Sequence, residues 1–149
     1  MCGIAGGWWK GSAQADSRLS RALEKIRYRG PDDSGYELYP VADSVVALGH
    51  TRLSILDLSS AGHQPMLSAD KRLSIVFNGE IYNYRELRAE LQGLGHGFVS
   101  DSDTEVLLAA WAQWGRACLE RLAGMFAFVV LDRQAGTLTC VRDAFGIKP

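Results

Sequence analysis

The sequence of 149 residues contains few cysteines and no long hydrophobic run. Its three cysteines, Cys2, Cys118 and Cys140, form no CxxC pair, which fits a reducing compartment and argues against a zinc knuckle or a disulfide framework. No stretch approaches the roughly 20 consecutive apolar residues that cross a bilayer. Glycines interrupt the apolar residues of the N-terminus, where a signal peptide would need a continuous apolar core. We therefore expect a cytoplasmic protein without a membrane partner.

An excess of charge of one sign is also absent. The chain has 16 Lys and Arg residues against 17 Asp and Glu residues, a formal net charge of -1, and no basic block. Because nucleic-acid binding depends on clustered positive charge, we expect no nucleic-acid partner. With 47% hydrophobic residues, the chain is long enough to bury one core and too short for two full domains, so we expect one compact unit.

Hydrophobic periodicity predicts helices and antiparallel strands in one mixed structure. Apolar residues at helical spacing indicate a helix within 16–30, and capping-box patterns at Asn83 and Ser102 mark the starts of two more helices. Clusters of β-branched and aliphatic residues between turn formers predict strands over 2–9, 34–40, 44–58, 71–79, 124–132 and 136–146. This order is typical of an α+β layer structure rather than of alternating βαβ units.

Two cysteines and two tryptophans are interpreted as packing residues. Cys118 lies in a helical pattern and Cys140 in an alternating run, so we expect both to be small buried hydrophobic residues. Trp111 and Trp114 are three apart on a predicted helix, and we expect them to pack in the core rather than to form a ligand cage. Cys2 follows the initiator methionine, which leaves an accident of sequence or a nucleophile at the start of the mature chain. A lipid attachment point would need a signal peptide before it.

Four polar features become informative when they are taken together with the Cys2 thiol. Singly, Arg52 is explained as a surface charge, Asn78 and Gly79 as a tight turn, and Asp103 by the dipole at a helix start. In combination, a thiol can attack an acyl carbon, and the side-chain N–H of Asn78 with the backbone N–H of Gly79 suits an oxyanion hole. Arg52 can bind a carboxylate and Asp103 an ammonium group, and those two groups describe an α-amino acid.

Eight motifs, in one order along the chain, carry a resemblance to a known family. They are MCGIAG, RGPDDSG, HTRLSILD, GHQPM, FNGEIYNYRELR, SDTE, GMFAF and RDAFGIKP. Over residues 1–149 the sequence resembles the N-terminal glutaminase domain of class II glutamine amidotransferases, and most of all that of glutamine-hydrolysing asparagine synthetases. The resemblance implies an N-terminal-nucleophile hydrolase fold, a four-layer αββα sandwich of two antiparallel sheets between helical layers.

The resemblance also implies roles for the matching residues. Cys2 matches a nucleophile that is exposed when Met1 is removed, and its own α-amine then serves as the base. Asn78 and Gly79 match the oxyanion hole and contact the substrate. The other residues that match glutamine contacts are Arg52 at the α-carboxylate, Asp103 at the α-ammonium group, Glu80, and the segment Leu53, Ser54, Ile55 and Leu56.

The implied activity is hydrolysis of L-glutamine to glutamate and ammonia, with no cofactor or metal in this chain. We expect residues 1–149 to be a C-terminally incomplete amidotransferase domain of an asparagine synthetase. The sequence contains no SGGxDS pyrophosphate loop, so ATP and Mg²⁺ are expected to belong to a further C-terminal synthetase domain that amidates aspartate. A relative that amidates another acid, a non-catalytic scaffold, a glutamine-binding module that retains Met1, and a homodimer are left open.

Two further expectations concern residues outside this set. Tyr28 stands where the family commonly has histidine before Arg-Gly-Pro-Asp, and we expect altered loop contacts rather than loss of activity. His50, His63 and His96 are not needed as bases, because the amine of Cys2 can move the proton, and we interpret them as structural.

Overall fold

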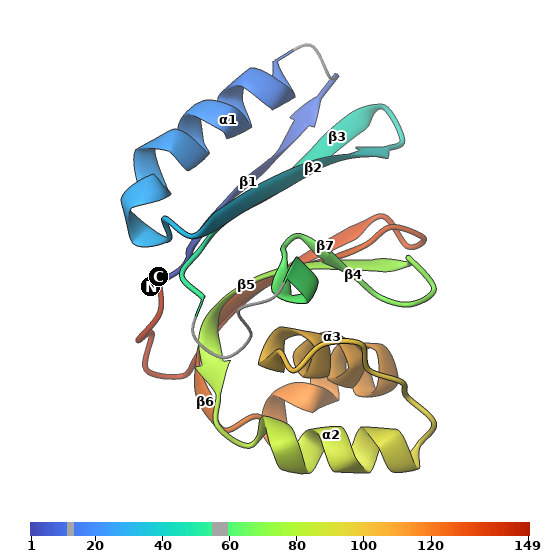
Figure 1. The fold of residues 1–149 in the computed structure, drawn as a ribbon. Helices are drawn as coiled ribbons and strands as arrows, with labels where there is room; N and C mark the ends of the chain where they lie inside the picture. The colour runs from blue at the N-terminus through green and yellow to red at the C-terminus, as the bar shows by residue number, and fades with distance from the viewer. Residues whose placement is uncertain (12–13, 55–59) are drawn as a thin grey trace.

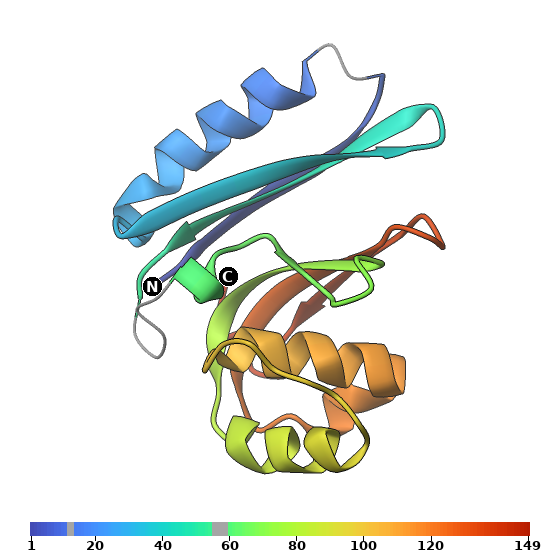
Figure 2. The same ribbon diagram turned by 45° about the vertical axis from the view of Figure 1, so that its right-hand side comes forward.

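The computed structural model describes residues 1–11, 14–54 and 60–149. Figures 1 and 2 show four layers: a helix, a sheet, a second sheet and a helical layer. The outer helix is α1 (Ala15–Ile26), and the opposite layer holds α2 (Tyr84–Gly93) and α3 (Asp103–Trp114). Short 3₁₀ helices span Arg27–Arg29, Ser60–Gly62 and Gly115–Arg121. The predicted αββα sandwich is therefore confirmed.

Both sheets are antiparallel, as predicted. One has the order β1-β3-β2, formed by β1 (Gly3–Lys10), β2 (Asp33–Val41) and β3 (Ser44–Arg52). The other has the order β4-β5-β6-β7, formed by β4 (Met66–Leu67), β5 (Leu73–Ile81), β6 (Gly124–Asp132) and β7 (Thr137–Arg142). The central strand β3 is buried beyond Ser44, because α1 covers one face of its sheet and the second sheet covers the other.

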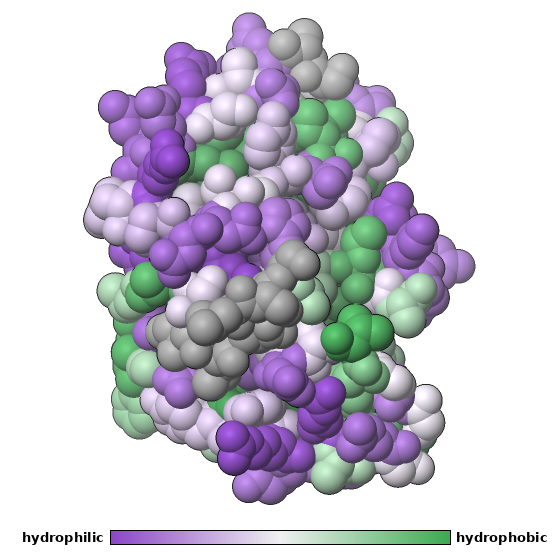
Figure 3. All heavy atoms as spheres, in the orientation of Figure 1, coloured by the Kyte–Doolittle hydropathy of each residue, from purple (hydrophilic) through white to green (hydrophobic). Residues whose placement is uncertain are grey.

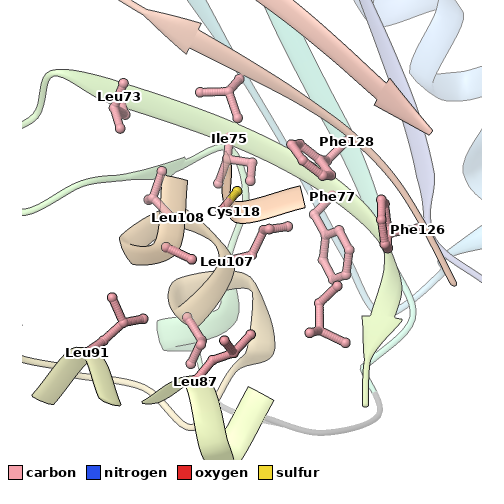
Figure 4. Close-up of a cluster of buried hydrophobic side chains, with 14 residues drawn as sticks. Leu73, Ile75, Phe77, Leu87, Leu91, Leu107, Leu108, Cys118, Phe126 and Phe128 are labelled. Atoms are coloured by element: carbon pink, nitrogen blue, oxygen red, sulfur yellow. The ribbon is translucent and has the colours of Figure 1, made fainter. Parts of the chain in front are cut away.

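The larger core lies between the four-stranded sheet and the helices α2 and α3. Figure 4 shows leucines of both helices pointing toward Phe77 of β5 and toward Phe126 and Phe128 of β6. Phe128 is 1% exposed, and Trp111 meets its ring edge-to-face with centroids 5.8 Å apart. Trp114 packs against the same core, so the predicted packing role of both tryptophans is confirmed. Buried aromatic area of this kind dominates the stability of small domains.

A second core joins the two sheets. Val46 and Leu48 of β3 pack against Val76 of β5, and the Tyr39 hydroxyl lies 2.7 Å from Ser74 Oγ. Because side chains alternate along a strand, odd-numbered residues of β5 such as Phe77 face the helices, while even-numbered residues face the first sheet. Asn78, next in the even series, is thereby directed into the space between the sheets.

The two predicted helix caps differ in outcome. Ser102 caps α3, because its Oγ accepts a hydrogen bond from the backbone N–H of Thr104 at 3.1 Å. Asn83 precedes α2 without capping it, so the predicted capping box there is wrong. Its side chain instead donates to the carbonyl of Arg121 and accepts from the N–H of Ala123, which fixes the chain entering β6.

The two cysteines outside the N-terminus also differ. Cys118 is fully buried in the core below the second sheet, as predicted. Cys140 is exposed, so its predicted burial is wrong. It pairs with Val129 across β6 and β7, and β7 is an edge strand. Alternation alone predicts which face a residue occupies, but burial also requires that another layer cover that face.

The outer face of α1 is hydrophilic, while its inner face packs on the first sheet. Leu19 and Leu23 are buried against Ala47 of β3. Figure 3 shows hydrophilic side chains gathered over this helix at the upper left of the molecule. Within the ranges that the structure describes, no helix is both long enough and apolar enough to span a bilayer.

Candidate active site

Strand and helix ends from both sheets meet at one end of the sandwich. In the first sheet, β1 begins beside the end of β3 and the start of β2, because Gly3 pairs with Thr51 and Asp33 pairs with Arg52. At the same end, a backbone N–H of β5 is hydrogen-bonded to Asp103 at the start of α3. Figures 1 and 2 show both termini at this end of the molecule. Residues far apart in the sequence are thereby brought to one place.

A pocket of about 240 Å³ lies at this end. Drug-sized ligands occupy pockets of roughly 300–1,000 Å³, so this one suits a smaller molecule. Seven of the ten predicted site residues line it: Cys2, Arg52, Leu53, Asn78, Gly79, Glu80 and Asp103. Ser54 is described but is not among the lining residues, and Ile55 and Leu56 lie outside the described residues.

The Cys2 thiol is held by backbone contacts at the start of β1. Its Sγ accepts from the N–H of Leu53 at 3.4 Å and lies 3.7 Å from the Leu53 carbonyl oxygen. The carbonyl of Cys2 accepts from Arg29 Nε at 3.0 Å, so both sides of the residue are fixed. Met1 precedes it and also lines the pocket. Sequence reasoning noted the motif that contains Arg29 but gave this arginine no role.

Past the end of the short strand β4, the edge of β5 that faces away from β6 presents a row of backbone N–H groups toward the pocket. The N–H of Phe77 donates to Gln64 Oε1 at 2.6 Å, and the N–H of Ile81 donates to Asp103 Oδ2 at 3.0 Å. Gly79 lies midway between them, and its partner on β6, Phe126, has its own N–H and carbonyl bonded to Asp143. Since N–H groups alternate sides along a strand, the N–H of Gly79 points to this outer edge, away from β6.

Glycine is required at position 79 by space. A side chain there would collide with the backbone of Met125 and Phe126 on the neighbouring strand. Asn78 is 2% exposed and faces the first sheet, where β1 begins. Two N–H donors, one from the Asn78 side chain and one from the backbone of Gly79, are thus available at the same pocket as the Cys2 thiol.

Arg52 ends β3 inside the pocket. It is 8% exposed, and its guanidinium packs so closely on Gly62 that any side chain at position 62 would collide with it. A buried guanidinium is a strong two-point binder of carboxylates. The neighbouring segment is fixed by Asp32, whose carboxylate accepts from the N–H of Ser54 at 2.8 Å. Tyr28, the departure from the family pattern, is 80% exposed and is absent from the described lining of the pocket.

Asp103 is a buried carboxyl group that forms no salt bridge with the residues the structure describes. It is 6% exposed at the first position of α3. Burial raises the pKa of its carboxyl from 3.8 to about 6, opposed by the N–H of Ile81 and aided by the negative charge of Glu80. A ligand ammonium group placed beside Asp103 would stabilise the ionised carboxylate and lower its pKa again.

The three histidines lie apart from the described lining of the pocket. His50 is buried, and its Nε2 lies 3.0 Å from the carbonyl oxygen of Phe77. Burial lowers the pKa of His50 to about 4, so its imidazole is neutral at pH 7. His63 lies 2.7 Å from Asp33, and His96 lies 2.8 Å from Gln113. Within the described ranges no group of three or more His, Cys, Asp or Glu residues is placed to hold a metal ion.

Gln64 and Lys148 are two of the lining residues that sequence reasoning missed. Gln64 is 4% exposed and bonds both β5 and α3, although its motif was noted. Lys148 is 8% exposed, and its N–H donates to Asp143, which also accepts from Phe126. Composition and periodicity do not predict the contacts of Gln64 and Lys148, because these contacts depend on which strands lie next to each residue in the fold.

Comparison with known proteins identifies the family. Residues 1–149 match the family model described as a glutamine amidotransferase domain. The putative glutamine-hydrolysing asparagine synthetase of Mycobacterium tuberculosis is 44% identical over 163 residues, covering 100% of this chain and 25% of that protein. Asparagine synthetase 1 (glutamine-hydrolysing) of Bacillus subtilis is 42% identical over 153 residues, covering 100% of this chain and 23% of that protein. The chain thus spans about a quarter of the length of these relatives.

A solved structure has the same fold. It is the glutamine phosphoribosylpyrophosphate amidotransferase from B. subtilis in complex with ADP and GMP, with a TM-score of 0.79 and 21% identity. The match covers 99% of this chain and 38% of that one. This likeness shows the fold, and the family match over residues 1–149 places the chain in the glutamine amidotransferase domain family.

Proposed function

We propose that this domain hydrolyses the side-chain amide of L-glutamine to glutamate and ammonia, with Cys2 as the nucleophile. The observation that carries the proposal is the shared pocket. The Cys2 thiol, the donors of Asn78 and Gly79, the Arg52 guanidinium and the Asp103 carboxyl all line it. Such a set offers one partner for each functional group of glutamine and for the charge that develops during acyl transfer.

Substrate binding depends on the two buried charged residues. Arg52 holds the α-carboxylate, and Asp103 holds the α-ammonium group, with Glu80 and Leu53 beside them. The ammonium group stabilises the ionised carboxylate of Asp103 and lowers its pKa again, so the buried negative charge gains a partner when glutamine binds. We assign Ser54, Ile55 and Leu56 to the adjoining segment on the resemblance alone.

Catalysis requires the removal of Met1. The α-amine of Cys2, with a reference pKa of about 7.7–8.0, then accepts the thiol proton. The thiolate attacks the amide carbon, and the C=O electron pair moves to oxygen, where the N–H groups of Asn78 and Gly79 stabilise the oxyanion. The amine then donates this proton to the leaving nitrogen. The C–N bond breaks, and ammonia departs. Water then cleaves the thioester, which releases glutamate and the free thiol.

The ammonia has a use in the longer relatives. Both relatives compared above are asparagine synthetases by name and are about four times as long as this chain. We propose that a C-terminal synthetase domain of the full-length protein uses the ammonia to amidate aspartate, with ATP and Mg²⁺ bound there and not in residues 1–149. The alternative is that the glutaminase domain supplies ammonia for the amidation of another acid. The homodimer and the cytoplasmic location stay predictions.

The test compares two cysteine variants of the full-length protein. Cys2→Ala should abolish glutamate release while ammonia-dependent synthesis persists, because only the first step needs the thiol. Cys140→Ala is the matched control, since this thiol is exposed and outside the pocket, and its glutaminase rate should equal that of the wild type. Glutaminase activity in Cys2→Ala would mean that another group is the nucleophile. Intact mass establishes whether Met1 is gone; retained Met1 with glutamine bound but not hydrolysed would favour a binding module.

A further inference from the structure

The side-chain amide of Gln64 connects two parts of the pocket that the proposed reaction uses together. Its Oε1 accepts from the N–H of Phe77 at 2.6 Å, directly before Asn78. Its Nε2 donates to Thr104 Oγ1 at 3.2 Å, directly after Asp103. Because an N–H can only donate, the orientation of the amide is fixed by Phe77. One buried group therefore joins the strand that carries the oxyanion donors to the helix start that carries the ammonium partner.

We propose that Gln64 is a positioning residue for glutamine hydrolysis, which holds the Asn78 and Gly79 donors in register with Asp103. This inference rests on the proposed function of the pocket. Gln64 lines the pocket, but its role follows from what it holds in place and needs no contact with the substrate.

The strand register explains why a side chain has this task. Met66 pairs with Ile75 and Leu67 with Ser74, so the continuation of β4 would place Gln64 opposite Phe77. Pro65 has no N–H and β4 does not extend past Met66, so the backbone ladder stops short of that pair. The Gln64 side-chain amide supplies the acceptor that the missing backbone pair would have supplied.

A second buried side chain, from the first sheet, holds the same residue of β5. His50 Nε2 lies 3.0 Å from the carbonyl oxygen of Phe77, and a carbonyl only accepts, so Nε2 carries the hydrogen. Both backbone polar groups of Phe77 are thereby bonded to buried side chains, one from the segment before β4 and one from β3. The backbone that leads into Asn78 is therefore held by Gln64, by His50 and by the pairing of β5 with β6.

Position matters here because an oxyanion donor works only over a narrow range of distance. The donors must lie about 2.7–3.1 Å from the place where the oxyanion forms, and a displacement of about 1 Å can cost a hundredfold in rate. Binding of the amino-acid end of glutamine is less sensitive, since charge attraction to Arg52 and Asp103 tolerates small shifts. Loss of Gln64 should therefore lower kcat more than it weakens binding.

The experiment measures kcat for glutamine hydrolysis and, separately, the Kd for the product L-glutamate in the full-length protein. In Gln64→Met the chain length is kept and both hydrogen bonds are lost. We expect kcat to fall about tenfold to a hundredfold while the glutamate Kd stays within about threefold. Alkylation of Cys2 by iodoacetamide needs no oxyanion hole, and its rate should be unchanged. Gln92→Met, on the exposed face of α2, is the matched control with wild-type kinetics.

A second variant keeps the inference testable if Gln64→Met folds poorly. Thr104→Val removes only the anchor on α3 and leaves the Phe77 bond in place, so kcat should fall less, about threefold to tenfold, again with the glutamate Kd preserved. An unchanged kcat in both variants, or a parallel loss of kcat and of glutamate binding, would overturn the positioning role. A wild-type protein that binds glutamate but never hydrolyses glutamine would instead overturn the proposed function.

Discussion

Asp103→Asn should make the protein more stable at alkaline pH while it removes the partner of the substrate ammonium group. Folding takes the carboxyl group of Asp103 out of water and raises its pKa from 3.8 to about 6. The native state therefore binds this proton more tightly than the unfolded chain does. The associated stabilisation is complete below pH 3.8 and is lost as the pH rises through 6.

The size of the effect follows from the two pKa values. A shift from 3.8 to about 6 corresponds to roughly 3 kcal/mol of unfolding free energy once the pH is well above 6. At pH 4.5 only about 1 kcal/mol of this has been lost, because the unfolded carboxyl is ionised and the native one is not. Asparagine has no charge to bury, and its Oδ1 can still accept from the N–H of Ile81, as Oδ2 of Asp103 does now.

Urea unfolding of the two proteins at pH 4.5 and pH 8 measures this difference. The stability advantage of Asp103→Asn should grow by about 2 kcal/mol between the two pH values. Asp101→Asn is the matched control, since the Asp101 side chain is 93% exposed and its pair with Arg88 at 3.6 Å is a surface one. That control should change stability by less than about 1 kcal/mol at either pH. An advantage that is constant with pH, or a variant less stable at pH 8, would refute the reasoning.

Three other outcomes are expected. Asn78→Ala should lower kcat for glutamine about a hundredfold to a thousandfold, as measured by glutamate release, because one oxyanion donor is lost; a change confined to KM would contradict that role. In a plot of log kcat/KM for glutamine against pH, the slope should steepen from one to two as the pH falls below about 6. The reason is that protonation of Asp103 then adds to protonation of the Cys2 amine. In Asp103→Asn the slope should stay at one. Phe128→Ala should destabilise the fold by about 3–5 kcal/mol in urea unfolding, and a loss below about 1 kcal/mol would mean that this core is not close-packed.

The motifs identified most of the pocket because its residues lie where strands and helices begin and end. Cys2 directly precedes β1, and Arg52 ends β3, the strand that pairs with β1. The combination of residue types and the family resemblance predicted that Asn78 and Asp103 belong to the same site, and both line the pocket. The turn residues, helix caps and hydrophobic periodicity that place such residues are local features, so they can be predicted from the sequence of the segment itself. The four-layer fold was predicted on the same resemblance.

What the sequence did not predict depends on neighbours from elsewhere in the chain. Cys140 lies in a run of alternating apolar and polar residues that is typical of a half-buried strand. The strand is at the edge of its sheet, however, and the Cys140 side chain is exposed there. Asn83 has a capping-box spacing, but the carbonyl of Arg121 and the N–H of Ala123 take its side chain. Gln64 has an ordinary loop sequence around it, and only the register of β4 and β5 shows what its amide replaces.

The central claim is that Cys2, freed of Met1, forms a thioester with the glutamyl group of its substrate. The most direct measurement is intact and peptide mass spectrometry of the full-length protein after reaction with a diazoketone analogue of glutamine. We expect a chain without Met1 that carries one label, on Cys2, and protection from labelling by excess glutamine. A label on Cys118 or Cys140, or a labelled chain that still carries Met1, would contradict it.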